Sequence, residues 1–230
     1  MSLPTADAAI RVNQLPPDLF STVLPLVIVL LSLTVHEAAH AWTSNRLGDP
    51  TARLLGRVSL NPIVHIDLIG TIILPVLAVI SNFPIIGWAK PVPVDIRRLR
   101  QPRRDFMLVA AAGPVSNLLI ALAASLVVRA QFATADPALE SASMLGGTLL
   151  AVSLMETVKI NVFLALFNLI PVPPLDGGNV LAGLLPPNAA VMFHNLRPFG
   201  FIILYAMMFT GLLGALIVPP AIFMLELLLP

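Results

Sequence analysis

Residues 19–42 read LFSTVLPLVIVLLSLTVHEAAHAW, and this stretch decides the class of fold. As a helix it is long enough to cross a hydrocarbon core of about 30 Å. Three further apolar stretches occupy residues 63–80, 106–128 and 144–170, and a longer apolar region fills 199–229. The pattern predicts an all-α polytopic membrane protein built as a bundle of transmembrane helices.

The composition excludes an ordinary soluble domain. Of the 230 residues, 57% are hydrophobic and only 11% are charged, and the mean hydropathy is +0.92. A typical soluble chain carries about 25% charged residues. The net charge of +1 gives no electrostatic basis for binding nucleic acid. The chain has no Cys, so any metal must be held by His, Asp or Glu.

Basic residues constrain the topology. Lys and Arg are concentrated in the connections 46–57 and 90–104, and the positive-inside rule places both on the cytoplasmic side. A full crossing by the segment between them would separate the two connections. We therefore expect residues 63–82 to re-enter rather than span. The alternating sequence GWAKPVPVDI, at 87–96, predicts a short extended edge strand.

The region 199–229 is too long for one comfortable crossing and too short for two. We expect a spanning helix followed by a kinked or interfacial piece, with the interruption at Pro219 and Pro220.

The first apolar helix ends in the order His36, Glu37, Ala, Ala, His40. In a helix His36 and His40 lie one turn apart on the same face, so both imidazoles can reach one ion. Glu37 lies about 100° around the helix, beside the metal, where a carboxylate takes a proton from water. Ionisable side chains inside hydrocarbon are costly and normally functional. Zinc is the expected ion, because it accepts N and O ligands and leaves one position open.

A catalytic zinc needs a third protein ligand. Asp49 is the one candidate in the next 20 residues, and His65 and Asp67 follow in NPIVHIDLIG. Asp176 is a better candidate, because the prolines of LFNLIPVPPLDGG must unwind the end of the fourth apolar segment. To share one ion, His40 and Asp176 must lie at the same depth, so the first and fourth segments must run the same way. They do so if 63–82 re-enters.

Five motifs occur in order between about residues 20 and 185: HEAAH, NPIVHIDLIGTIILP, GWAKPVPV, AAAGPVSN and LFNLIPVPPLDGG. Together they resemble the site-2 protease family of intramembrane zinc metalloproteases, in its short prokaryotic form. The resemblance implies one zinc ion per chain on His36, His40 and Asp176, with Glu37 as general base. It also implies that Asn168 helps to position the substrate or the oxyanion.

Two more residues match family positions without a defined role. We expect Asn117 to serve helix packing or strand contact. His65 either ties down the re-entrant turn or acts near the site.

The expected activity is hydrolysis of peptide bonds in or near transmembrane segments of membrane proteins. The resemblance implies a single membrane-embedded metalloprotease domain over 1–230, with its catalytic core at about 19–185 and a C-terminal apolar region at 198–230. We expect it in a prokaryotic cell (inner) membrane, with the active site toward the cytoplasmic side. The alternative is a non-proteolytic metal-binding membrane protein or metal transporter. Glu37 argues against that alternative, because activating water requires it and binding a metal does not.

Overall fold

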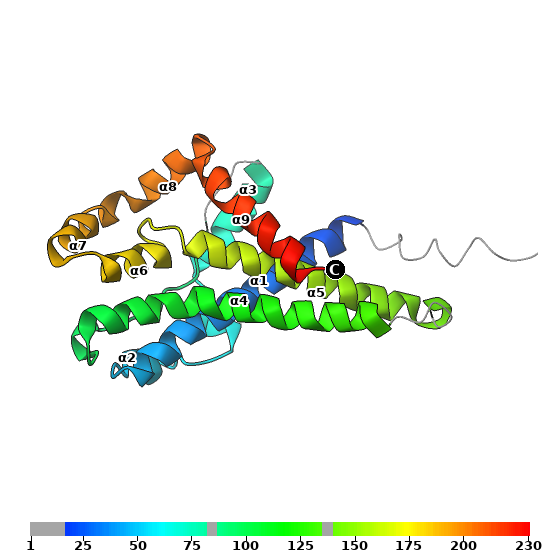
Figure 1. Ribbon diagram of the computed structural model, residues 1–230, viewed down its shortest axis with the longest axis horizontal. Coiled ribbons are helices and arrows are strands. Elements are labelled where there is room, and N and C mark those ends of the chain that lie inside the picture. Colours follow the sequence, from blue (N-terminus) through cyan, green and yellow to red (C-terminus); the bar gives the residue numbers. More distant parts are fainter. Residues whose placement is uncertain (1–16, 82–86, 135–139) are drawn as a thin grey trace, which may run out of the picture.

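The computed structural model describes residues 17–81, 87–134 and 140–230, which form a bundle of helices (Figure 1). Three long helices dominate the bundle: α1 (Pro17–Arg46), α4 (Pro102–Thr134) and α5 (Glu140–Asn168). The colours in Figure 1 show that α1 and α5 run in the same direction and that α4 runs opposite to both. This is the arrangement that lets the ends of the first and fourth apolar segments meet at one depth.

Within the described ranges, four helical stretches are long and apolar enough to cross a membrane. They are Val23–Arg46, Pro102–Ala133, Leu149–Asn168 and Pro187–Phe209. The predicted all-α polytopic membrane fold is therefore confirmed. The last of the four stretches includes α7 (Pro187–His194), η5 (Arg197–Phe199) and α8 (Gly200–Phe209).

The second apolar segment forms short elements instead of one long helix. The turn η2 (Pro62–His65) is followed by η3 (Leu68–Ile73) and α3 (Leu74–Ser81), of 6 and 8 residues. At a helical rise of about 1.5 Å per residue, these two helices together extend roughly 20 Å, less than a hydrocarbon core. Residue 82, the last of the segment expected to re-enter, lies outside the described ranges.

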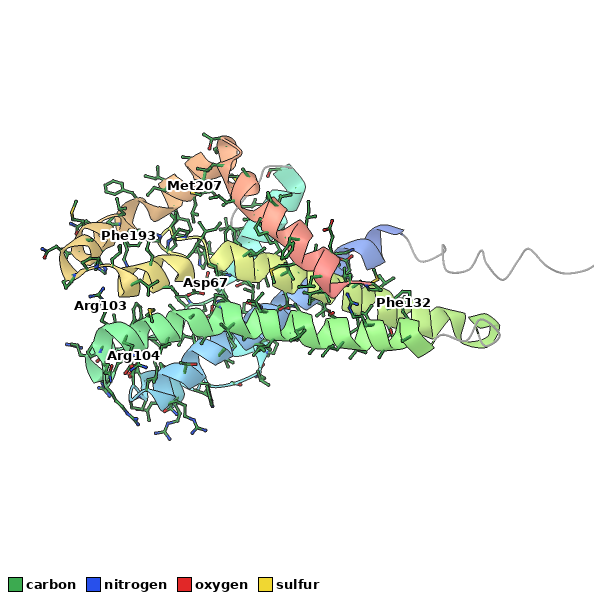
Figure 2. All side chains as sticks on the ribbon, viewed as in Figure 1. Asp67, Arg103, Arg104, Phe132, Phe193 and Met207 are labelled. Carbon is green, nitrogen blue, oxygen red and sulfur yellow. The ribbon has the colours of Figure 1, made fainter. Side chains whose placement is uncertain are left out.

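The two basic connections lie at the same end of the bundle, beside α2 (Thr51–Leu54). The N–H of Arg100 donates to the carbonyl of Leu47 at 3.1 Å, and the N–H of Asp95 donates to the Asp49 carboxylate at 2.8 Å. Figure 2 shows Arg103 and Arg104 at this end of α4 and the apolar Phe132 toward its other end. The chain between α2 and α4 therefore leaves this end of the bundle and returns to it.

The edge strand expected at 87–96 is not found, and the described residues contain no strand. The chain there has no regular structure until the turn η4 (Ile96–Arg98). The N–H groups of Trp88 and Lys90 donate to carbonyls of the second segment, at 3.2 and 2.9 Å. Pro91 and Pro93 have no N–H to offer. The anchored N–H groups and the two prolines leave no series of free donors in 87–96 from which a ladder within the chain could form.

The C-terminal apolar region breaks at Gly211 and not at its two prolines. Gly211 has φ of +75°, in the left-handed region that glycine favours, and joins α8 to α9 (Leu212–Leu228). Pro219 and Pro220 lie inside α9, so the interruption expected at these residues is wrong. In Figure 1, α9 folds back from α8 and returns along α5.

Small side chains let the helices pack closely. One cluster joins α4 to α5 through Ala121, Ala124, Val158 and Val162. A second cluster packs the loop after α5 against α8 and α9 through Ile170, Leu175, Leu204, Met207 and Ile217. The second cluster holds the start of α6 (Asp176–Leu184), and Asp176 is therefore presented from a packed loop.

Candidate metal centre

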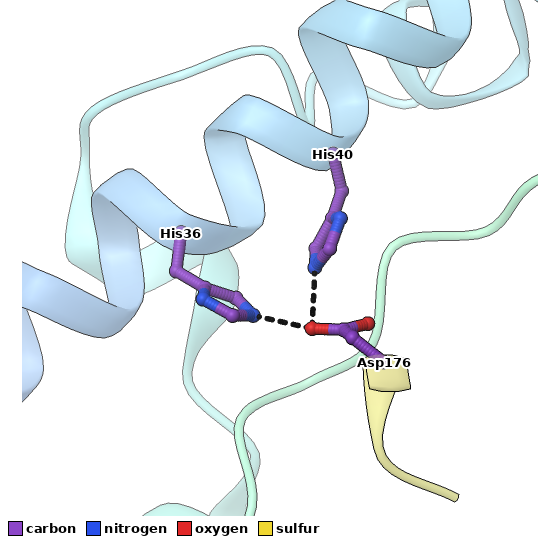
Figure 3. Close-up of side chains that lie close together, drawn as sticks. All are labelled: His36, His40 and Asp176. Carbon is purple, nitrogen blue, oxygen red and sulfur yellow. Dashed lines mark ion pairs between the residues drawn. The ribbon is translucent and has the colours of Figure 1, made fainter. Parts of the chain in front are cut away.

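The side chains of His36 and His40 on α1 meet Asp176 at the start of α6 (Figure 3). The Nε2 atoms of His36 and His40 lie 3.0 and 3.3 Å from Oδ2 of Asp176. The three ligand atoms all lie within 4.8 Å of one another. Ligands around a tetrahedral zinc at about 2.0–2.2 Å are themselves separated by roughly 3.3 Å. The spacing and the donor types therefore fit a zinc ion.

Helical periodicity on α1 supplies the two histidines. A buried polar stripe repeats every four residues along this helix and consists of Ser32, His36, His40 and Ser44. The two histidines are 3% and 7% exposed, so their ring nitrogens need partners inside the protein.

Those partners come from α4. Nδ1 of His36 lies 2.6 Å from Oδ1 of Asn117, and Nδ1 of His40 lies 2.6 Å from the carbonyl oxygen of Val109. Histidines that bind a metal normally use their second nitrogen in this way, which fixes the ring and its tautomer. The structure thus places Asn117 beside the candidate metal ligand His36, a contact that the sequence did not predict.

Gly113 on α4 forms one wall of the candidate metal site. A Cβ at this position would lie 2.5 Å from Nε2 of His36 and 2.5 Å from Nε2 of His40. Only glycine leaves room for an ion between these nitrogens and the helix backbone. In the sequence, Gly113 is recognisable as a glycine inside a long apolar helix. A glycine there lowers the stability of the helix by about 1 kcal/mol relative to alanine.

The loop that presents Asp176 turns tightly before α6. A Cβ on Gly177 would lie 2.2 Å from the carbonyl oxygen of Leu169, so the close approach requires glycine. The loop also contains a cis peptide bond between Pro173 and Pro174. Burial raises the pKa of Asp176, but the adjacent His40 and His36 outweigh burial and hold that pKa below its ordinary value. In this arrangement the two histidines favour an ionised carboxylate at Asp176.

Glu37 is half-buried and touches the Pro-rich segment after α3. Its carboxylate accepts a hydrogen bond from the N–H of Val92 at 3.2 Å. The buried Arg57 donates to the carbonyl oxygens of Lys90 and Pro91 in the same segment. Burial lowers the pKa of Arg57 and the nearby Glu37 opposes that change. Glu37 and Arg57 therefore both hold this segment next to the metal ligands.

The other sequence candidates for the third ligand have structural partners. The Asp49 carboxylate accepts from Thr51 and from the N–H of Asp95. The Asp67 carboxylate accepts from two N–H groups at the start of η3. Nε2 of His65 lies 2.8 Å from the carbonyl oxygen of Ser59. These contacts hold turns of the connection between α1 and α4.

Asn168 stands at the end of α5, and its side-chain nitrogen donates to the carbonyl of Leu164 at 2.9 Å. It is not one of the three grouped ligands, and its role toward a substrate stays a prediction.

The sequence model described as Peptidase family M50 matches residues 25–210. The chain belongs to peptidase family M50. This confirms the resemblance to the site-2 proteases on which the expected activity rests, and with the four apolar helical stretches it makes the chain an integral membrane protein.

Curated relatives agree with the family. "Putative zinc metalloprotease YwhC" of Bacillus subtilis (strain 168) is 36% identical over 195 residues, which cover 85% of this chain and 84% of the relative. The protein called Rip2 of Mycolicibacterium smegmatis, described in the same words, is 29% identical over 212 residues, covering 90% and 75%. No solved structure gives a significant match. The family and these relatives support an intramembrane zinc metalloprotease.

Proposed function

We propose that the protein hydrolyses peptide bonds in or near transmembrane segments of membrane proteins, with one zinc ion held by His36, His40 and Asp176. The observation that carries the proposal is the convergence of three ligand atoms across α1 and α6: the Nε2 atoms of His36 and His40 lie 3.0 and 3.3 Å from Oδ2 of Asp176. The proposed unit is a single metalloprotease domain over 1–230, with its catalytic core at about 19–185 and a C-terminal apolar region at 198–230.

Glu37 is the proposed general base. A zinc ion bound at this site would act as a Lewis acid toward the peptide carbonyl and would lower the pKa of a water. Glu37 follows His36 in α1, so its carboxylate lies beside the ligands without being one of them. It accepts the proton of the attacking water and returns a proton to the leaving amine. The hydrogen bond from Val92 orients the carboxylate for this task.

Asn168 is the proposed substrate-positioning residue. Its side-chain nitrogen carries two protons, and one of them already donates to Leu164. The second proton is available for a substrate carbonyl or for the oxyanion that forms during hydrolysis. Seven residues separate Asn168 from Asp176, and the packed loop that they form supports a defined distance between the two.

A substrate helix must unwind before its carbonyls can be attacked, because helical hydrogen bonds occupy them. We propose that the unwound peptide lies along the segment 87–95. This segment is fixed through Trp88 and Lys90 to the second apolar segment and through Val92 to Glu37. A fixed, non-helical chain beside the base is a suitable support for an extended peptide.

The proposed membrane arrangement has residues 63–82 re-entering from the cytoplasmic side, with the active site toward that side of a prokaryotic cell membrane. Two contacts between the basic connections support it, Arg100 to Leu47 and Asp95 to Asp49. Because the two basic connections lie on one side of the membrane, the segment between them cannot span the membrane from one side to the other. The positive-inside rule assigns that side to the cytoplasm.

The proposal is tested by Glu37→Gln, assayed on a model transmembrane substrate in detergent with zinc content measured on the same preparation. The two side chains are nearly the same shape, so zinc binding should survive. Cleavage should fall by at least about 10²-fold, the usual scale for a lost general base. Near-wild-type cleavage by the zinc-loaded variant would remove the general-base role and favour a metal-binding protein or transporter.

A further inference from the structure

A buried chain of hydrogen bonds links α5 to the metal centre. Nδ2 of Asn161 donates to the carbonyl oxygen of Thr157 and to Oγ of Ser32, both at 2.9 Å. Oδ1 of Asn161 accepts from Nδ2 of Asn117 at 2.8 Å. Oδ1 of Asn117 then meets Nδ1 of His36 at 2.6 Å. Both Asn side chains are fully buried, so water does not replace any of these contacts.

The direction of this chain follows from its far end. A backbone carbonyl can only accept, so the group of Asn161 that faces Thr157 must be the NH₂. The oxygen of Asn161 then faces Asn117, so Asn117 must donate to it from its own NH₂. That leaves the Asn117 oxygen facing His36, and an oxygen there requires a proton on Nδ1. In the neutral ring, the form of histidine that binds a metal, the proton is then absent from Nε2, the nitrogen that faces Asp176.

We propose that Asn161 is a positioning residue of the metal centre, which acts through Asn117 to hold His36 in the tautomer that can bind zinc at Nε2. The proposal rests on the metal site proposed above. An amide can turn over and exchange its oxygen and NH₂ at little steric expense. Without Asn161, nothing in the chain of hydrogen bonds prevents Asn117 from presenting its NH₂ to His36, which would favour the proton on Nε2.

His40 shows why only one of the two histidines needs this arrangement. Its Nδ1 faces the carbonyl oxygen of Val109, which cannot change from acceptor to donor. His36 faces a side-chain amide, which can do so. The tautomer of His40 is thus fixed by a backbone carbonyl, whereas that of His36 depends on the orientation of a side-chain amide. Changes at Asn161 should therefore act on His36 alone.

A purely structural role for Asn161 is the competing explanation. Asn161 on α5 touches Ser32 on α1 and Asn117 on α4, and such hydrogen bonds between membrane helices stabilise their packing. On that explanation, substitution would lower the thermal stability of the protein and leave its affinity for zinc unchanged once folded. Metal affinity therefore separates the two roles.

The test measures zinc affinity by chelator competition and the visible spectrum of the Co²⁺-substituted protein, on purified full-length protein in detergent. Asn161→Leu keeps the branch at Cγ and removes the acceptor for Asn117. It should weaken zinc binding by about 10- to 100-fold, as loss of an outer partner of a metal ligand does, and should alter the Co²⁺ bands. Ser32→Ala is the matched control, because the Thr157 carbonyl still sets the direction. It should bind zinc within about two-fold of wild type.

Asn117→Asp in the Asn161→Leu background provides a rescue. A carboxylate only accepts, so it demands a proton on Nδ1 of His36 whatever lies at 161. Zinc affinity should return to within a few-fold of wild type. Absence of rescue, or wild-type affinity in Asn161→Leu, would overturn the proposal.

If Asn161→Leu does not fold, Asn161→Ser carries the same test, because its hydroxyl bonds back to its own helix and cannot reach Asn117. Wild-type protein without any zinc would instead overturn the metal site itself, so the two failures are distinguishable.

Discussion

The backbone N–H of Val92 donates to the carboxylate of Glu37 at 3.2 Å, across 55 residues of sequence. This bond joins the proposed general base directly to the segment along which we propose that the substrate lies. Next to Val92, the side chain of Arg57 also holds this segment by donating to the carbonyls of Lys90 and Pro91. The orientation of the base and the position of the substrate therefore depend on the same few contacts.

Arg57→Met should lower kcat/KM by about ten-fold or more. The variant keeps most of the apolar stem of Arg57 and removes a charged donor, and hydrogen bonds to charged groups contribute about 1.5–3 kcal/mol. The measurement is steady-state cleavage of a model transmembrane substrate, with zinc content on the same samples. Arg53→Met changes an exposed arginine of the same connection and should leave both values unchanged. Equal kinetics in the two variants would show that Arg57 does not support the segment.

Gly113→Ala should abolish stoichiometric zinc binding. The added Cβ would lie 2.5 Å from the Nε2 atoms of His36 and His40, where an ion has to fit. Zinc content by metal analysis and cleavage should fall together, by at least ten-fold. Gly214→Ala is the control, since a Cβ at that position meets nothing within 4 Å. A zinc-loaded, active Gly113→Ala protein would place the ion elsewhere.

Asp176→Ala should lose zinc and activity, because it removes one of the three converging ligand atoms. Asp67→Ala removes the carboxylate that caps η3 and should lower thermal stability by about 0.5–2 kcal/mol while keeping zinc. Metal analysis and thermal unfolding on both proteins distinguish the two roles. The opposite result, with zinc lost only in Asp67→Ala, would make Asp67 the third ligand.

Cysteines introduced as Arg53→Cys and Arg100→Cys should react with an impermeant maleimide from the same side of the membrane. The connection after α1 and the connection before α4 touch through Leu47 and Arg100, so both belong to one end of the bundle. The chain has no Cys of its own, and each label therefore reports a single position. Labelling from opposite sides in right-side-out and inverted vesicles would rule out re-entry of 63–82.

The site residues that the sequence predicted are those with a local signal. His36, Glu37 and His40 stand out because charge in an apolar helix is costly and because helical spacing groups the two histidines. Asp176 stands out because prolines unwind the chain around it. Gly113 has only the weaker signal of a glycine inside a long apolar helix, and the role of Asn161 has none. Their contacts depend on which helices are neighbours, and that is known only when α1, α4 and α5 are placed together.

The two departures from the expected fold also have physical causes. Alternation at 87–96 resembles a strand, but a strand needs a partner, and the available N–H groups are used elsewhere. The two prolines of α9 resemble a break, but a reversal of direction needs a left-handed residue, which Gly211 supplies. Composition alone does not report either kind of constraint.

The close approach of α4 at Gly113 has a consequence for inhibitors of this protein. The backbone of α4 lies directly against the two histidine rings, so this side of the proposed metal site leaves a compound no depth. A metal-chelating inhibitor should therefore present a flat, small chelating group toward α4. Selectivity should then come from contacts on the other sides of the proposed site, such as the segment that Val92 joins to Glu37.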